Sequence, residues 1–193
     1  MAHAIPKIEW KNVTQTGTRT GGSPIIASML NTTGIEVGML CEGDGIPTGA
    51  TVISTTSTSV TLSVNAMAPG TTALNFLYRI SFDYPPIETE GETLDSKERN
   101  TPALSGVTQT SVDYVEGKRT LEFSHVTQAI KDAYYNFFRT YAYLGQDFYY
   151  YDDKTLNTYI YVELFDLKFV PKKIAPNGSG YTWKFQMKIR RVL

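Results

Sequence analysis

One cysteine, Cys41, is all that the 193-residue chain contains, so no disulfide can form within it. We expect Cys41 to be a small apolar filler in a core, and its isolation suits synthesis in a cytosol, which keeps thiols reduced. No stretch approaches the roughly 18 consecutive apolar residues of a membrane span, and the N-terminal run MAHAIPKIEW lacks the apolar core of a signal peptide. The sequence therefore predicts no membrane span.

An excess of charge of either sign is also missing, because 18 basic residues stand against 19 acidic ones, for a formal net charge of -1. Without a basic field we expect no specific nucleic-acid partner. Histidine is scarce: His3 lies near the terminus, and His125 falls in the first turn of an expected helix, where we assign it a structural role. Neither has the local partner that a catalytic base needs.

Metal and phosphate motifs are equally absent. Asp152 and Asp153 precede Lys154, but no further ligand follows at a recognisable spacing, so we interpret them as a solvated turn. Glu42 and Asp44 lack the other acids of an EF-hand loop. The glycine-rich run GDGIPTGA is followed by a strand pattern, whereas a phosphate cradle needs a helix there. The sequence predicts no catalytic residue, no cofactor and no metal, and hence a protein that is not an enzyme.

Aromatic residues are missing from Thr14 to Asn75, a stretch that has no lysine and is rich in Thr, Ser and Gly. In and just after it, the β-branched runs TVIS, SVTLSV and ALNFLYRI are separated by turn residues. Val60, Leu62 and Val64 alternate with hydroxyl residues, which gives the second run one apolar face. We predict that residues 14–75 form an inserted small all-β module, and that residues 1–13 and 76–193 form a second domain.

An amphipathic helix is predicted over residues 124–144. Its apolar residues share one arc of the helical wheel: Val126, Ala129, Ile130, Ala133, Tyr134, Phe137, Tyr141 and Leu144. Ser124 is the expected N-cap, and Gly145 is expected to adopt the left-handed conformation that ends the helix. Such a bulky stripe needs a broad apolar surface beneath it, so we expect the helix to lie on a β-sandwich or barrel.

Strands are predicted around this helix. The first covers residues 5–13, and the segment SGVTQTSVDYVEGKRTLEFS is expected to be a hairpin that turns at Glu116 and Gly117 and sets Val112 and Tyr114 opposite Leu121 and Phe123. The final strand alternates most clearly. Its expected apolar face is Tyr181, Trp183, Phe185, Met187 and Ile189, and its polar face is Thr182, Lys184, Gln186, Lys188 and Arg190.

Residues 83–103 are polar and proline-bearing, which predicts a long loop or arm rather than a regular element. This arm has six acidic and two basic residues, a net charge of minus four, whereas Lys184, Lys188 and Arg190 form a basic strip on the final strand. We predict that arm and strip meet between copies. A group of tyrosines could stack sugars or bases, but we interpret it as interface or core: Tyr149, Tyr150, Tyr151, Tyr159 and Tyr161.

Three segments together resemble tail-tube-fold proteins of long-tailed bacteriophages, and most nearly the minor and distal tail proteins at the tail tip: SGVTQTSVDYVEGKRTLEFSHVT, YYNFFRTYAYLGQDFYYYD and YTWKFQMKIRRV. The resemblance covers residues 1–13 and 76–193 and carries no catalytic residue. Separately, GMLCEGDGIPTGATVISTTSTSVTLSVNAMAPGTTALNF looks like a small β unit of phage tail and fibre proteins. The early position of this module departs from the family pattern.

The resemblance implies a mainly β fold: a β-sandwich or barrel of tail-tube type, flanked by a single amphipathic helix, plus the inserted module. It also implies a structural subunit that forms a ring with copies of itself, expected to be a hexamer, at the tail tip. The ring would join the tail tube to tip or fibre proteins in the virion, after synthesis in the host cytoplasm. The alternative is a carbohydrate-binding module for host attachment, since a Thr-rich β unit and surface tyrosines could hold a glycan; a hydrolase lacks its triad or carboxylate pair.

Overall fold

The computed structural model describes residues 4–102, 108–177 and 180–192. The chain is mainly β, with 47% strand and an open antiparallel sheet. One α-helix, α1 (Gln128–Thr140), occurs in the described ranges, and no helix there is long and apolar enough to cross a membrane. The mainly β class with a single helix is therefore confirmed, while the tail-tube architecture stays a prediction.

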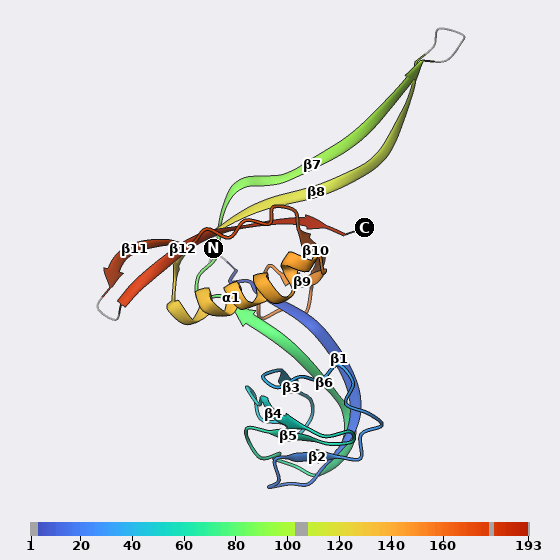
Figure 1. The fold of residues 1–193 in the computed structure, drawn as a ribbon, viewed down its shortest axis with the longest axis vertical. Coiled ribbons are helices and arrows are strands. Elements are labelled where there is room, and N and C mark those ends of the chain that lie inside the picture. The colour runs from blue at the N-terminus through green and yellow to red at the C-terminus, as the bar shows by residue number, and fades with distance from the viewer. Residues whose placement is uncertain (1–3, 103–107, 178–179, 193) are drawn as a thin grey trace. The chain divides into compact units, whose positions relative to one another are not determined.

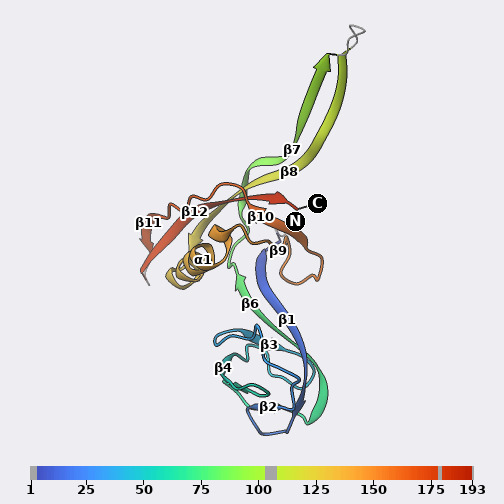
Figure 2. The same ribbon diagram turned by 45° about the vertical axis from the view of Figure 1, so that its right-hand side comes forward.

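The chain forms two compact units, one of residues 9–79 and the other of residues 1–8 with 80–193. The borders that we expected from composition, at residues 13/14 and 75/76, lie inside the long strands β1 (Lys7–Arg19) and β6 (Gly70–Ser81). These two strands pair with each other, as Figures 1 and 2 show from two directions. Each strand continues without a break through its compositional border.

The smaller unit contains four short strands between β1 and β6: β2 (Ile25–Ala27), β3 (Leu40–Glu42), β4 (Val52–Thr55) and β5 (Val60–Leu62). Their order is β4-β5-β2-β1, and β6 pairs with β1 and with β3. The three predicted β-branched runs are confirmed as β4, β5 and β6. The predicted first strand is β1, which extends further along the chain than expected.

Small and aliphatic residues fill the core of this unit, as the sequence predicted. The buried cluster is Ile26, Met29, Ile35, Met39, Cys41, Ile46, Ala50, Val52, Val60, Leu62, Ala66, Leu74 and Phe76. Val64 was expected on the same face as Val60 and Leu62, but it is exposed because β5 ends at Leu62.

The larger unit is built on strands that follow in the order β9-β10-β12-β8-β7, with β11 also paired to β12. Their bounds are β7 (Ile87–Pro102), β8 (Thr108–Val126), β9 (Phe148–Tyr151), β10 (Ile160–Leu164), β11 (Lys172–Asn177) and β12 (Gly180–Arg191). Aromatic rings from α1 and from the sheet form the core between them: Tyr134 stacks on Phe185 at 4.6 Å between ring centroids, and Phe137 meets Phe148 edge to face at 5.0 Å.

Two expectations about residues 83–126 are wrong. The predicted arm contains a regular strand, β7, which pairs with β8 in register from Ile87↔Glu122 to Pro102↔Thr108. The predicted turn at Glu116 and Gly117 does not exist, since both residues lie inside β8 and pair with Asp95 and Leu94. In the backbone register Val112 therefore lies opposite Glu98 of β7, and not opposite Leu121 or Phe123 as we predicted. The acidic segment forms a strand because β8 pairs with it (Figure 1).

The helix is shorter than predicted. Strand β8 continues to Val126, whose backbone pairs with Trp183, so Ser124 lies in a strand and is not the N-cap. Thr127 is the N-cap instead, and its hydroxyl accepts a hydrogen bond from the Ile130 amide. At the other end a 3-10 turn, η1 (Ala142–Leu144), follows α1, and Gly145 adopts the predicted left-handed conformation with φ 70°.

The predicted apolar arc is correct in part. Val126, Tyr134 and Phe137 are buried and Ile130 and Tyr141 are half-buried, whereas Ala129, Ala133 and Leu144 are exposed. The alternation of the final strand is confirmed where Phe185, Met187 and Ile189 are buried. It fails at the irregularity between Trp183 and Phe185, because Thr182 is buried there, and the side chain of Tyr181 lies outside the described residues.

Candidate functional site

His125 lies at the end of β8 and not in a helical turn as predicted. Its φ of 58° is left-handed, which is uncommon for a residue other than glycine. Together with Asp83 and Ser124 it lines a pocket of about 490 Å³. No hydrogen bond joins these three side chains in the described part of the chain. A base that activates a nucleophile lies within hydrogen-bond reach of it, and the structure shows no such bonded pair among these three residues.

Asp152 and Asp153, which we considered as metal ligands, each interact with another side chain. Asp152 pairs with Arg119 at 2.9 Å, and Asp153 accepts hydrogen bonds from the hydroxyl and amide of Thr155, which lower the pKa of its carboxyl. Within the described ranges, no group of three or more His, Cys, Asp or Glu side chains is placed to hold a metal ion. The pair forms the turn that we predicted.

Glu42 and Asp44, which we considered as a possible ligand pair, lie near different arginines. Arg79 donates to Glu9 at 2.7 Å and forms a two-pronged ion pair with Glu42. Asp44 lies 3.7 Å from Arg19. Cys41 is buried as expected, and burial raises the pKa of its thiol to about 12, with Arg19 opposing the shift. Its thiol is therefore protonated at neutral pH and is no reactive nucleophile.

The tyrosine group divides into two sets. Tyr150 and Tyr151 are buried, whereas Tyr149 is half-buried and Tyr159 and Tyr161 are exposed. Tyr149 meets Tyr159 edge to face at 4.8 Å and lies 5.2 Å from Tyr161. The three outer rings of Tyr149, Tyr159 and Tyr161, which we call the tyrosine patch, are the part that could bind a partner.

A carboxyl group lies beside the tyrosine patch. Burial and the neighbouring Glu163 raise the pKa of Asp147, while Arg190 lowers it. The pKa of Tyr161 is raised by burial and by Asp147. The two side chains therefore interact electrostatically, and the patch combines exposed aromatic faces with a nearby acid.

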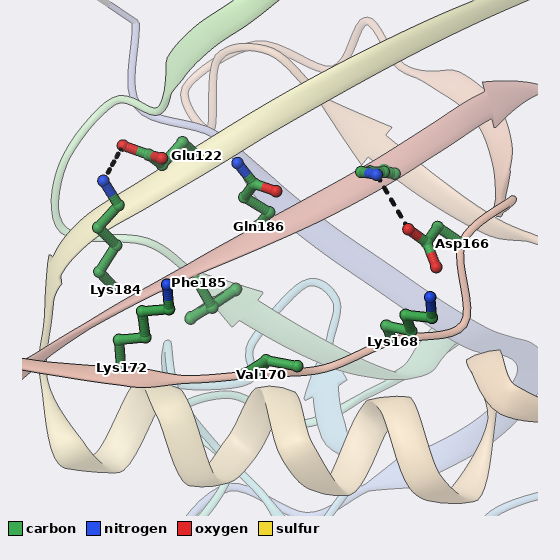
Figure 3. Close-up of a pocket in the computed structure, with 9 residues that line it drawn as sticks. Glu122, Asp166, Lys168, Val170, Lys172, Lys184, Phe185 and Gln186 are labelled. Atoms are coloured by element: carbon green, nitrogen blue, oxygen red, sulfur yellow. Dashed lines mark hydrogen bonds and ion pairs between the residues drawn. The ribbon is translucent and has the colours of Figure 1, made fainter.

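A groove of about 410 Å³ lies between β12 and the chain segment 166–172 that leads into β11. We call it the lysine groove. Four lysines and two carboxylates line it: Lys168, Lys172, Lys184, Lys188, Glu122 and Asp166. Both carboxylates pair with lysines of β12, and Figure 3 shows the pair of Glu122 and Lys184. The lining therefore carries more positive than negative charge.

Ion pairs account for only half of these lysines. Lys184 lies 2.6 Å from Glu122, and Lys188 lies 2.9 Å from Asp166. Lys168 and Lys172 are exposed, and neither has a carboxylate partner in the described part of the chain. Two ammonium groups thus remain free to meet an anion from outside.

The basic strip predicted on the final strand is consequently a row of ion pairs. Lys184 and Lys188 are paired as above, and Arg190 lies 2.6 Å from Glu163. The acidic side chains from Glu88 to Glu98 lie outside the described residues, so the expected contact between arm and strip stays a prediction. Its basic partners, however, are already engaged within the chain.

Sequence reasoning missed Lys168 and Lys172 as lining residues of a groove. The available signal was the alternation of Lys168, Val170 and Lys172 around Phe169. Phe169 lies 5.2 Å from Tyr134 and 5.3 Å from Phe185, and this contact anchors the segment while its neighbours face the groove. Lys173 points elsewhere, over the ring of Trp183 at 5.5 Å.

Comparisons of the chain with protein-family models, with curated proteins and with solved structures gave no match.

Proposed function

We propose that this chain is a structural subunit of a long-tailed bacteriophage tail, a distal or minor tail protein whose copies form a ring at the tail tip. In this proposal the open sheet and α1 correspond to a tail-tube-type domain, and the ring, expected to be a hexamer, joins the tail tube to tip or fibre proteins. The protein would be made in the host cytoplasm and act in the virion. The resemblance of three sequence segments to such proteins supports this assignment.

The structural observation that carries the proposal is the ribbon formed by β7 and β8. In β8, the pairing with β12 begins at Lys118, which lies opposite Arg190. The residues of β8 that precede Lys118, back to Thr108, pair with β7 alone among the described strands. A two-stranded ribbon is at best marginally stable in water, and its outer edges present unpaired backbone groups.

Contact with a neighbouring subunit would supply what the ribbon lacks. A ribbon that meets a different surface of the next copy makes a head-to-tail contact, and repetition of such a contact closes a ring when the rotation permits. The acidic composition of β7 would hinder unspecific edge-to-edge pairing and so favour a defined partner.

Removal of the ribbon tests the proposal. Residues 94–117 would be replaced by Asn-Gly, which joins the paired residues Thr93 and Lys118 through a two-residue hairpin turn. The pairing of Lys118 with Arg190 and the rest of the β8–β12 ladder is left in place. We expect the full chain to sediment as a ring and the shortened chain as a folded monomer with the same helical circular dichroism.

Two results would contradict the proposal. A full-length chain that stays monomeric at all concentrations tested removes ring formation. A shortened chain that still forms the ring shows that the ribbon does not hold it together.

The tyrosine patch favours the second candidate, a carbohydrate-binding module that contributes to host-surface attachment. Exposed aromatic faces beside the Asp147 carboxyl are suited to a sugar, which presents apolar C–H groups and hydroxyls. A glycan array on the intact protein and on Tyr159→Ala decides this: binding that the substitution abolishes supports the module, and an array without a hit removes it.

A further inference from the structure

We propose that the lysine groove is a carboxylate-binding site and that the acidic β7 segment of a second copy of this chain occupies it. The inference rests on the proposed function, since it requires the chain to assemble with itself. It goes further by naming both sides of one contact: Lys168 and Lys172 in one copy, and residues 87–98 in the next.

The first step is the charge that the chain leaves unneutralised. Lys184 and Lys188 are held by Glu122 and Asp166, but Lys168 and Lys172 are not paired in the described chain. Figure 3 shows both free lysines on the strand-like segment that faces β12, with their ammonium ends toward the groove. An ammonium group donates up to three hydrogen bonds and accepts none, so the pair calls for acceptor oxygens.

The second step is a gap in the backbone pairing of β12 along the same groove. On the side away from β8, β12 pairs with β11 at Lys184 and with β10 at Ile189. The Lys188 carbonyl accepts a hydrogen bond from the Phe165 amide on this side, at 3.2 Å. Because backbone groups alternate in direction along a strand, the N–H and C=O of Gln186 face the same way as those of Lys188.

No described strand pairs with Gln186 on that side, and the residue is exposed. The backbone N–H of Gln186 therefore provides a third hydrogen-bond donor in the groove, besides the two ammonium groups. Lys168 and Lys172 are four residues apart on an extended segment, a span of roughly 13 Å, so an incoming strand would meet them with separate carboxylates. Val170 and Phe185 also line the groove and give the rest of an incoming side chain an apolar surface.

The third step identifies the source of the carboxylate. Strand β7 carries five acidic and two basic residues in its 16 positions, and four of the acids fall between Glu88 and Asp95. It is the last strand in the sheet order, so β8 uses one of its edges and the other is open to a neighbour. An extended, acidic edge complements a groove with an unpaired backbone position and free ammonium groups.

The chain's own β7 is badly placed for this contact. In the sheet order β8 lies between β7 and β12, which separates the two backbones by about two strand spacings, or roughly 10 Å. The free backbone groups of Gln186 point away from β8 and hence away from that β7. A second copy meets neither obstacle.

Carbodiimide coupling tests the contact directly, because it forms an amide bond only between an amine and a carboxylate that touch. Unlabelled and ¹⁵N-labelled full-length chains would be mixed, coupled and analysed by mass spectrometry, so that links between copies are told from links within one. The pair of Lys184 and Glu122, 2.6 Å apart, is the internal positive control. We expect links between labelled and unlabelled chains that join Lys168 or Lys172 to residues 87–98.

A pair of matched variants gives the energetic test. The double substitution Lys168→Gln with Lys172→Gln should weaken assembly about tenfold, in keeping with two partly exposed ion pairs, and the effect should shrink as salt rises. Lys154→Gln with Lys173→Gln removes the same charge outside the groove lining and should change assembly less than about twofold.

The failures are distinguishable. A protein that sediments as a monomer overturns both the proposed function and this contact. A ring whose lysines couple elsewhere, only within a chain, or not at all overturns this contact alone. A third experiment adds free glutamate to the ring and measures acetylation of Lys168 and Lys172. If glutamate protects both lysines while the ring stays intact, the groove binds a free carboxylate and the assignment to β7 is wrong.

Discussion

Phe137→Ala tests the packing of α1 on the sheet, because the Phe137 ring makes several of the buried contacts between them. Phe137 is completely buried, and its ring lies 5.7 Å from that of Tyr134, 6.1 Å from Tyr141 and 5.0 Å from Phe148. The ring thus connects the helix, the chain that follows it and strand β9. Its removal leaves a cavity at the centre of an aromatic core that has little freedom to collapse.

Truncation of a buried phenylalanine to alanine costs about 3 to 5 kcal/mol, from lost transfer free energy and from the cavity. A domain of this kind is stable by roughly 5 to 15 kcal/mol, so the variant loses a large part of its margin. Asn136→Ala is the matched control, because Asn136 is the exposed neighbour on the same helix. Its effect should stay within about 0.5 kcal/mol, with alanine's higher helix propensity acting in the stabilising direction.

Urea unfolding followed by circular dichroism at 222 nm measures both variants. Trp183 provides a local fluorescence signal, since its indole N–H donates to Gln128 in the first turn of α1 at 2.7 Å. The reasoning is refuted if Phe137→Ala and Asn136→Ala have equal midpoints, or if Phe137→Ala loses under about 1 kcal/mol. Either result would mean that the buried face of α1 is wrongly assigned.

Two further predictions concern the smaller unit. Burial raises the pKa of Cys41 from 9.0 to about 12, so the folded state favours the protonated thiol; the stability it contributes is complete below about pH 9 and is lost as pH rises toward 12. The unfolding free energy of Cys41→Ala should therefore fall less steeply over that range in alkaline urea titrations. Arg79→Met removes a guanidinium that pairs with the buried Glu9 carboxylate and should cost about 3 kcal/mol, whereas Lys11→Met, which breaks an exposed pair, should cost under about 1 kcal/mol. Equal costs in urea unfolding would contradict this.

Patterns that repeat within a few residues predicted the local structure well. The alternation of Phe185, Met187 and Ile189 reflects a strand with one buried face, and all three are buried. Tyr134 and Phe137 follow the helical period for the same reason. Gly145 ends the helical region as predicted because a left-handed residue is needed there and glycine adopts it without strain.

Features that depend on distant partners were not predictable in this way. Strand β7 has a poor strand composition and exists through its ladder with β8. Thr127 rather than Ser124 caps the helix, although both carry a hydroxyl, because β8 continues until Val126 pairs with Trp183. Local sequence contains neither pairing.

The lysine groove shows the same limit at the level of a site. The sequence contains all four lysines, but the net charge of the groove depends on which carboxylates the fold places beside them. Glu122 comes from β8 and Asp166 from the segment after β10, and together they neutralise Lys184 and Lys188. Only the fold reveals that, among the described residues, no carboxylate pairs with Lys168.

The mass of the native assembly tests the central claim most directly. Native mass spectrometry of the full-length chain from low-salt buffer should give a closed species, expected at six times the 21.5 kDa mass of one chain. The same species should be absent when residues 94–117 are replaced by Asn-Gly. A single peak at 21.5 kDa for the full-length chain across the concentration range would contradict the claim that it is a ring-forming subunit.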